Sequence, residues 1–363
     1  MKSLYAYFGL LDLHDIDSPG HSLYQLGLID SIACQFNQEK FDFLTYYPDE
    51  ILPTRGSSKE LIGFPEDSHH SKIFKEYFEM RIDEYLISAH RVFSNISNRT
   101  YDKLFLKARF RNLSTLGRKW RDARLFENLI QHAIEYGYGQ EDIIILDTDL
   151  SLSKKFVEKY RGLVTIVIPS IDFPAISGSF LKDCYTANVE NWGNKCEGLN
   201  TVYYGNVDTS KYKEGNQKNA ILGQAIRRIE EMKDREDTLT LICKREDYSG
   251  AVINTALNIH IDRNDRIGIF NSLAMSNIML NVTKDKYNDL EFIPARIYEA
   301  IIFGMIPVSY RFEFMHTAFS FNDLDDLEEI YLYFKECSHQ DMLTNYTSFV
   351  NSFINAKPFS SSN

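Results

Sequence analysis

The sequence predicts an α/β protein whose two domains face each other across a central cleft, and three observations lead to this class. The chain has 363 residues, whereas one hydrophobic core stops growing at roughly 250 to 300 residues. Short apolar runs alternate with segments whose apolar residues recur every three or four positions, as in strand–helix–strand units. This alternation pauses at a stretch richer in Gly, Asn and Ser, 177–200, and then restarts. We therefore expect two successive Rossmann-like domains.

The first half opens with an apolar strand that ends at about Leu13. In the helix expected next, apolar residues share one face at Leu23, Leu26, Ile29, Ile32 and Ala33. The run at 142–149, DIIILDTD, is apolar through its centre, which is typical of a parallel strand buried on both faces. The other elements expected in this half are strands at 41–47, 103–110 and 163–169 and a helix at 121–136.

The second half repeats the alternation after the Gly-, Asn- and Ser-richer stretch. The strands expected here are 201–205, 238–244, 277–282 and 305–310. The helices expected here are 215–233, 270–275, 294–303, 324–337 and 341–354. Because strands and helices alternate in both halves, each half is expected to form its own parallel sheet.

Composition excludes several classes of protein. With 44% hydrophobic and 25% charged residues, the chain is not predominantly disordered. No apolar run reaches the about 20 residues that cross a bilayer, and the opening segment meets Asp too early for a signal peptide. The five cysteines are scattered without a CxxC pair, which favours a reducing cytoplasm over a disulfide framework or zinc ribbon.

Several common ligand motifs are also missing from the sequence. Neither GxGxxG nor GxxxxGK[ST] occurs, so the usual phosphate-binding loops are absent. HExxH and EF-hand patterns are absent as well, and the pair His69–His70 lies in a polar segment where we expect solvated side chains. We therefore expect no metal site.

A basic stretch stands out within an acidic chain. The net charge is −11, yet the segment 101–124 has a charge of +6. Such segregation favours binding of a polyanion, although a solvated helix face or internal ion pairs would also explain it. Its two acidic residues are Asp102 and Asp122, and its eight cations are Lys103, Lys107, Arg109, Arg111, Arg118, Lys119, Arg121 and Arg124.

Asp149 follows the buried strand expected at 142–149 and is a candidate general base. Ligands of open α/β sheets bind beyond the carboxyl ends of the strands, and a partly desolvated carboxylate there has a raised pKa that suits proton abstraction. The alternative is that Asp149 caps the following helix.

Arg296 and Glu299 lie three residues apart, so on a helix they share one face. Arginine offers forked donors to phosphate oxygens, whereas a glutamate accepts hydrogen bonds from the hydroxyls of a ribose. The pair therefore suggests a nucleotide site. The alternative is an ion pair on a surface helix.

Taken in order, these segments resemble the bacteriophage DNA glucosyltransferases of the β, inverting type, whose two-domain fold is called GT-B. The matching segments are Pro19–Leu26, the YDKL run at 101–104, Thr148–Asp149, the Tyr-Gly turn at 204–206, and Tyr287–Asp289 followed by Arg296–Glu299. They occur in the family's order with similar spacing.

The resemblance implies a UDP-sugar-dependent enzyme that glycosylates 5-hydroxymethylcytosine in phage DNA with inversion. In that case Asp149 is the general base, Arg296 binds the diphosphate and Glu299 binds the ribose. A loop at 266–269 would contact the uracil, and Lys211, Lys213 and Lys218 are the cations available to the phosphates. The nucleotide-sugar site implied is Arg296, Glu299, Tyr287, Gly205, Lys213, Lys218, Ile267, His21 and Ser22.

The identity of the sugar and of the base stays open. The family has a carboxylate near the sugar where this chain has His21 or Ser22, so arabinose is an alternative to glucose. Hydroxymethyluracil is an alternative base. The resemblance implies no tightly bound cofactor, with Mg²⁺ or Mn²⁺ as an optional activator at the diphosphate.

The resemblance also implies that the basic stretch forms a groove for double-stranded DNA that contains the hydroxymethylated base. The target nucleotide must be flipped out of the stack to reach a buried base catalyst. We expect a monomer in the cytoplasm of the infected host, with no membrane partner. The groove residues implied are Arg109, Arg111, Arg118, Lys119 and Arg121.

The domain limits expected on this basis are 1–190 for the acceptor and DNA domain, completed by a C-terminal helix at about 341–363, and 200–340 for the UDP-sugar domain. Two other functions remain open. The first is a GT-B glycosyltransferase with the same donor site and a small-molecule, lipid or polysaccharide acceptor. The second is a non-catalytic protein that binds nucleotide or DNA.

Overall fold

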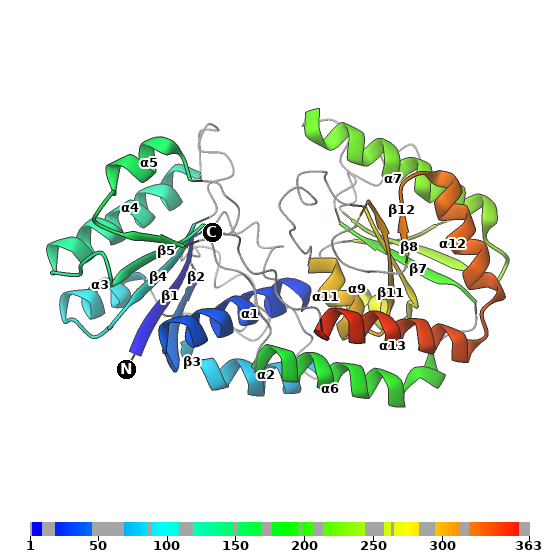
Figure 1. The fold of residues 1–363 in the computed structure, drawn as a ribbon, viewed down its shortest axis with the longest axis horizontal. Coiled ribbons are helices and arrows are strands. Elements are labelled where there is room, and N and C mark those ends of the chain that lie inside the picture. Colours follow the sequence, from blue (N-terminus) through cyan, green and yellow to red (C-terminus); the bar gives the residue numbers. More distant parts are fainter. Residues whose placement is uncertain are drawn as a thin grey trace. The chain divides into compact units, whose positions relative to one another are not determined.

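The computed structural model divides the chain into two compact units, residues 1–177 with 358–363 and residues 178–357 (Figure 1). Each unit contains a six-stranded parallel sheet with helices on both faces. The residues that the structure describes are 2–8, 19–45, 69–85, 87, 89–108, 119–147, 152–167, 176–195, 198–205, 213–243, 258–262, 265–282, 295–311 and 319–355.

The first sheet has the strand order β3-β2-β1-β4-β5-β6. The chain lays down β1, β2 and β3 in one direction and then returns to the other side of β1 with β4. The order therefore reverses between β1 and β4, which makes this point the topological switch of the sheet. The strands are β1 (Lys2–Phe8), β2 (Lys40–Thr45), β3 (Ile82–Tyr85), β4 (Leu104–Ala108), β5 (Ile143–Leu146) and β6 (Thr165–Val167).

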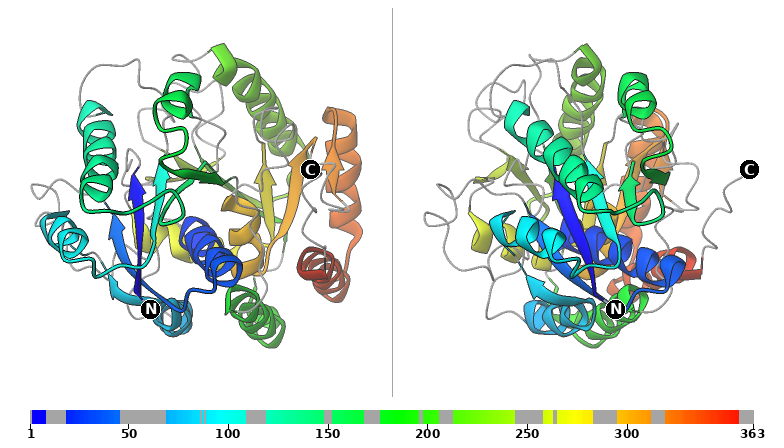
Figure 2. Two further views of the ribbon diagram at one scale, coloured as in Figure 1. Left: turned by 60° about the vertical axis from the view of Figure 1, so that its left-hand side comes forward. Right: turned by 90° about the vertical axis from the view of Figure 1, so that its left-hand side faces the viewer.

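Aromatic and aliphatic side chains attach helices to both faces of this sheet. On one face, Tyr5 of β1 stacks on Phe43 of β2, whose ring contacts Phe78 of α2 at 5.8 Å between centroids. On the other face, Leu4 and Ala6 belong to a core shared with α3, α4 and α5 (Figure 2). The helices are α1 (Pro19–Phe36), α2 (His69–Arg81), α3 (Ala89–Ser97), α4 (Lys119–Glu135) and α5 (Lys154–Lys159).

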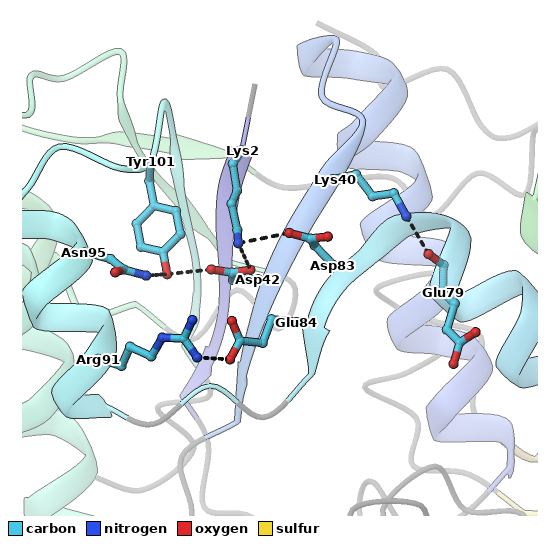
Figure 3. A network of polar contacts seen from close by, with 9 residues as sticks. All are labelled: Lys2, Lys40, Asp42, Glu79, Asp83, Glu84, Arg91, Asn95 and Tyr101. Carbon is cyan, nitrogen blue, oxygen red and sulfur yellow. Dashed lines mark hydrogen bonds and ion pairs between the residues drawn. The ribbon is translucent and has the colours of Figure 1, made fainter.

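A polar network closes the amino edge of the first sheet (Figure 3). The carboxylate of Asp42 is buried, and Lys2 Nζ lies 2.8 Å from its Oδ1 and 2.9 Å from Asp83 Oδ2. The Tyr101 hydroxyl donates to Asp42 Oδ2 at 2.9 Å and accepts from Asn95 Nδ2. Both oxygens of the buried carboxylate therefore have partners, which offsets the cost of desolvating it. The carboxyl edge, where ligands bind in such sheets, lies at the opposite end of the strands.

The second sheet repeats the same topology, with the order β12-β11-β10-β7-β8-β9. Its switch point lies between β7 and β10, which pair in parallel. The strands are β7 (Asn200–Tyr204), β8 (Thr238–Cys243), β9 (Ile259–Asp262), β10 (Ile278–Asn281), β11 (Ile306–Tyr310) and β12 (Ser320–Phe321).

Helices α7 and α12 cover one face of the second sheet, and α9, α11, α6 and α13 lie on the other. On the first face, Tyr331 of α12 hydrogen-bonds to Thr201 of β7. On the second face, Tyr298 of α11 packs edge-on against Phe353 of α13. The helices are α6 (Ile176–Glu190), the 3-10 turn η3 (Trp192–Asn194), α7 (Lys213–Met232), α9 (Arg266–Met275), α11 (Ala295–Ile302), α12 (Leu324–Glu336) and α13 (His339–Asn355).

The α/β class with two Rossmann-like units is thus confirmed, but the segments between the units differ from expectation. The expected linker at 177–200 is largely helix α6 and the turn η3. Helix α13, expected to complete the first unit, belongs to the second. Trp192 Nε1 donates to His339 O at 3.2 Å and the Trp192 ring stacks on Tyr346, so these contacts hold α13 there. Among the described residues, no helix has the length and apolar character needed to traverse a bilayer.

Candidate functional site

The arginine predicted to bind phosphate lies at the switch point of the second sheet. Arg296 is the second residue of α11, and its Nε donates to Tyr204 O at the end of β7. Its Nη1 donates to Asn281 Oδ1 at 3.4 Å and to Val282 O at 3.3 Å, both at the end of β10. The guanidinium also lies over the ring of Tyr203, 5.1 Å from its centroid. One side chain therefore links the carboxyl ends of the two strands between which ligands of this fold bind.

Gly205 makes room for this arrangement immediately after β7. A Cβ at position 205 would lie 3.0 Å from Arg296 Cζ and closer still to Nη2, so any other residue would displace the guanidinium. The sequence predicted both Gly205 and Arg296 as site residues, and the structure places them in contact. The requirement for glycine here is the close approach of the arginine.

Arg296 retains hydrogen-bonding capacity for a ligand. A guanidinium carries five N–H donors, of which two are on Nη2. Among the described residues, no hydrogen bond from Nη2 is present, whereas Nε and Nη1 are both engaged. An anion at Nη2 would therefore receive a charge-assisted hydrogen bond from a group whose orientation is already fixed.

Two buried polar residues of this site were not singled out from the sequence. Asn281 and Ser309 are both fully buried on neighbouring strands, and Asn281 Nδ2 donates to Ser309 Oγ at 3.2 Å. This bond turns Asn281 Oδ1 toward Arg296. The signal in the sequence was an asparagine at the carboxyl end of an otherwise apolar run, NIMLNV.

Glu299 lies one turn after Arg296 on α11 and is 1% exposed. The alternative of an ion pair on a solvated surface helix therefore does not describe this pair. Arg296 is bound to the strand ends, and Glu299 is on a buried part of the helix. Of the two residues predicted for nucleotide binding, Glu299 is thus buried and Arg296 is half-buried at the carboxyl edge of the second sheet.

In the first unit, the structure excludes one alternative for Asp149, although residue 149 itself lies outside the described residues. Strand β5 ends at Leu146, and the next residue, Asp147, accepts a hydrogen bond from Leu152 N at 3.3 Å. The N-cap of the following helix, α5, is Ser153, whose Oγ accepts from Phe156 N at 3.1 Å. Capping of this helix is therefore not the role of Asp149.

Two cations of the basic stretch have partners within the first unit. Lys107 is 4% exposed, and its Nζ lies 4.3 Å from the ring centroid of Tyr24. Lys103 Nζ donates to Glu141 O at 2.7 Å at the amino edge of the sheet. The side chains of the other six cations are outside the described residues. The groove residues Lys119 and Arg121 lie in the first turn of α4, whereas Arg109, Arg111 and Arg118 are not described.

The remaining predicted site residues have mixed outcomes. Ile267 is 67% exposed, and the expected loop at 266–269 is the first turn of helix α9, because Asp265 caps it by accepting from Gly268 N at 2.9 Å. For His21, Ser22, Lys213 and Lys218, only the helical backbone of α1 and α7 is described, and Tyr287 and Lys211 lie outside the described residues. Within the described part of the chain, no group of three or more His, Cys, Asp or Glu is arranged to hold a metal ion.

Comparisons with known proteins give similarity in fold. No protein-family model matches the chain, and no curated protein matches it. Solved structures match over nearly the whole chain. The ADP-heptose lps heptosyltransferase II of E. coli is 9% identical, with 97% of this chain and 99% of that one covered and a TM-score of 0.39. An E. coli structure described as trehalose-6-phosphate bound with UDP-2-fluoro glucose is 9% identical, with 98% and 96% covered and a TM-score of 0.44.

A third similar structure is the UDP-GlcNAc 2-epimerase of Neisseria meningitidis, bound to UDP-GlcNAc. It is 9% identical, with 99% of this chain and 96% of that one covered and a TM-score of 0.38. The three structures thus include a transferase and an epimerase. At this level of similarity the function has to be argued from the site of this chain.

Proposed function

We propose that this chain is a nucleotide-sugar-dependent glycosyltransferase that transfers a sugar from a UDP-sugar to the hydroxymethyl group of 5-hydroxymethylcytosine in DNA. The observation that carries the proposal is the guanidinium of Arg296, fixed at the switch point of the second sheet with Nη2 available. The α/β fold with two Rossmann-like units and the sequence resemblance to DNA glucosyltransferases support it.

In this proposal the second unit holds the donor. Arg296 Nη2 binds the diphosphate, and Gly205 leaves the space in which the guanidinium and the phosphate oxygens meet. Glu299 accepts hydrogen bonds from the ribose hydroxyls. The other donor contacts proposed are Tyr287, Lys213, Lys218, the first turn of α9 at Ile267, and His21 or Ser22 near the sugar.

The first unit supplies the catalytic base, Asp149. Its carboxylate takes the proton of the hydroxymethyl group while that oxygen attacks the anomeric carbon of the sugar. The bond between the anomeric carbon and the diphosphate oxygen breaks as the new bond forms on the opposite side, so the configuration inverts and UDP leaves. The leaving diphosphate gains negative charge, which the cation of Arg296 stabilises. Mg²⁺ or Mn²⁺ at the diphosphate is an optional activator.

The acceptor in this proposal is a nucleotide flipped out of double-stranded DNA. The cations proposed to contact the phosphates are Arg109, Arg111, Arg118, Lys119 and Arg121. Because each phosphate contact releases counterions, binding should weaken steeply with salt. The net charge of −11 opposes binding, since the rest of the chain repels DNA.

One observation favours a second candidate with the same donor site and an acceptor other than DNA. Lys103 and Lys107 are engaged within the first unit, which leaves six of the eight cations of the basic stretch for DNA. A small molecule, a lipid headgroup or a polysaccharide would need fewer cations. The donor chemistry at Arg296 would be unchanged.

Mass spectrometry of nucleosides tests the proposal directly. The chain is incubated with hydroxymethylcytosine DNA and either UDP-glucose or UDP-arabinose. A hexose or pentose increment on the base supports the proposal and identifies the sugar. No increment, in a protein that binds UDP, supports the second candidate instead.

Asp149→Asn separates an enzyme from a binding protein. The variant should bind UDP as well as wild type and lose turnover, because an amide cannot take the hydroxyl proton. Unchanged turnover would contradict the role of Asp149. Absence of turnover in wild type with all acceptors would favour a protein that only binds nucleotide.

A further inference from the structure

We propose that Asn188 and Lys195, which lie away from the nucleotide site, are positioning residues that hold helix α11 and thereby aim Arg296 at the diphosphate. The inference rests on the proposed function and adds to it the residues that fix the geometry of the donor site. It is carried by the contacts at the C-terminal end of α11.

Asn188 of α6 binds the last two residues of α11. Its Nδ2 lies 3.0 Å from each of three acceptors, Ile301 O, Ile302 O and the Tyr346 hydroxyl, which share its two N–H groups. That hydroxyl donates in turn to Ile301 O at 2.8 Å. The terminal carbonyls of a helix have no partner within the helix, so one amide and one phenol supply partners for the end of α11.

Lys195 joins the end of α11 to the end of α9. Its Nζ donates to Phe303 O at 2.9 Å, just after α11, and to Ser276 O at 2.6 Å and Ala274 O at 3.2 Å at the end of α9. An ammonium has three N–H donors, and all three have acceptors here. A cation is also favourable beside the negative ends of two helix dipoles.

Gly304 shows how closely these two side chains approach the turn after α11. Its φ is +69°, in the left-handed region that favours glycine. A Cβ at this position would lie 3.1 Å from Asn188 Cγ and 3.2 Å from Lys195 Cε. The turn is therefore packed against both positioning residues.

The short length of α11 explains why contacts at its C-terminal end determine the position of its first turn. The helix has eight residues, so it is about 12 Å long. A tilt of about 5° about its C-terminal end would move its first turn by about 1 Å. The bonds from Arg296 Nη1 are already 3.3 and 3.4 Å long, so a shift of this size would break them. Displacements of about 1 Å at a reacting group can cost about 100-fold in rate.

The experiment measures UDP affinity by calorimetry, well below the unfolding temperature, in the full chain. Asn188→Ala and Lys195→Met should each weaken UDP binding about 10-fold, because the guanidinium of Arg296 is no longer held in its position. Their matched controls on the same segment are Asn191→Ala, whose exposed amide bonds only to Ala187 O of its own helix, and the exposed Lys182→Met. Both controls should stay within about 2-fold of wild type.

A second readout separates positioning from simple stability. In Asn188→Ala the KM for the UDP-sugar should rise while the KM for the acceptor stays unchanged. A lower unfolding temperature with unchanged UDP affinity would show that the contacts only stabilise the fold, and would overturn the inference. If Asn188→Ala or Lys195→Met does not fold, Tyr346→Phe removes one hydroxyl only, and unchanged UDP affinity in that variant likewise overturns it.

The two proposals fail in different ways. A wild-type chain that binds none of UDP, ADP, GDP, CDP and dTDP overturns the proposed function together with this inference. A wild type that binds UDP, with variants that bind it equally well, overturns only the positioning role of Asn188 and Lys195.

Discussion

The guanidinium of Arg296 occupies the space that a side chain at Gly205 would fill. The two residues are far apart in the sequence, at the end of β7 and at the start of α11, yet a Cβ on Gly205 would lie 3.0 Å from Arg296 Cζ. The contact explains why a Tyr-Gly turn and a later arginine occur together in this chain. A single methyl group on residue 205 should therefore displace the guanidinium.

Gly205→Ala should therefore weaken UDP binding by about 10-fold or more without unfolding the protein, since the guanidinium must leave the end of β7. Calorimetry with UDP and the unfolding temperature measure the two effects. Gly223→Ala is the matched control, because a Cβ there meets nothing within 4 Å. Gly223 lies inside α7, so that variant should gain about 0.5 to 1 kcal/mol in the free energy of unfolding. Equal UDP affinity in Gly205→Ala and wild type would show that the close approach is unimportant.

Arg296→Lys should lose UDP affinity although it keeps the positive charge. A lysine is a point charge that cannot reach Tyr204 O, Val282 O and a phosphate together. Losing the bond to Tyr204 O should also cost about 1 to 3 kcal/mol in the free energy of unfolding, because a part-buried, charge-assisted hydrogen bond is removed. Arg227→Lys on the exposed side of α7 is the control and should change stability by less than about 0.5 kcal/mol. Full UDP binding by Arg296→Lys would place the diphosphate elsewhere.

The network at the amino edge of the first sheet predicts a dependence of stability on pH. Hydrogen bonding and the charge of Lys2 lower the pKa of Asp83 from 3.8. A carboxyl whose pKa is lowered in the folded state stabilises the fold above its unfolded pKa, and this stabilisation is lost as pH falls through the folded value. Asp83 is half exposed, so the effect should be below about 1 kcal/mol.

Urea unfolding of wild type and Asp83→Asn at several pH values measures this effect. The difference between the two proteins should be largest above about pH 5 and should disappear once the pH falls below the lowered pKa of Asp83 in the folded protein. Asp102→Asn, at an exposed position just before β4, controls for the removal of one negative charge. A difference that grew toward low pH would contradict the ion pair.

Salt dependence of DNA binding tests which cations of the basic stretch contact phosphate. Lys107→Met should leave the slope of log affinity against log salt unchanged, because Lys107 is buried over Tyr24 and makes no phosphate contact. Replacing Arg121 by Ala should reduce the magnitude of that slope by about 1, as expected for one phosphate contact. Electrophoretic or fluorescence titrations between low and moderate salt measure both slopes. The reverse order of effects would mean that DNA contacts a different surface.

Cysteine reactivity reports the packing of α6. Cys184 is buried in this helix, and burial raises the pKa of its thiol, whereas Cys34 on α1 is exposed. With iodoacetamide at pH 8, Cys34 should react quickly and Cys184 only when the second unit opens, because the thiolate is the reactive form. Peptide mass spectrometry over time measures both rates. Equal rates would contradict the burial of α6.

Much of the fold followed from local patterns in the sequence, and the errors have a physical reason. The apolar run that became β5 and the periodic segment that became α4 were predicted because each pattern is strong over its whole length. The segment of α6 was predicted as a linker because of its Gly, Asn and Ser content. The free energy gained by burying Phe180, Leu181 and Cys184 outweighs the low helix propensity of those residues. Tertiary packing therefore decided the structure of this segment.

The site was predictable in its residue types and not in its contacts. Arg296 and Glu299 could be recognised from their spacing, because helical periodicity places them on one face. Two of the three hydrogen-bond partners that Arg296 has among the described residues are the backbone carbonyls of Tyr204 and Val282. Any residue type carries such a carbonyl, so the sequence could not reveal these contacts. The N-cap of α5 is Ser153 and not Asp149, because the helix begins at Lys154.

The strand order of the two sheets has a consequence for how the protein is made. All six strands of the first sheet precede residue 168, and all six strands of the second follow residue 199. A ribosome that adds about 5 to 20 residues per second needs about 9 to 36 seconds for residues 178–357. Helices form within microseconds, and small domains typically fold within seconds. The first sheet should therefore form during translation, before the second unit has been synthesised.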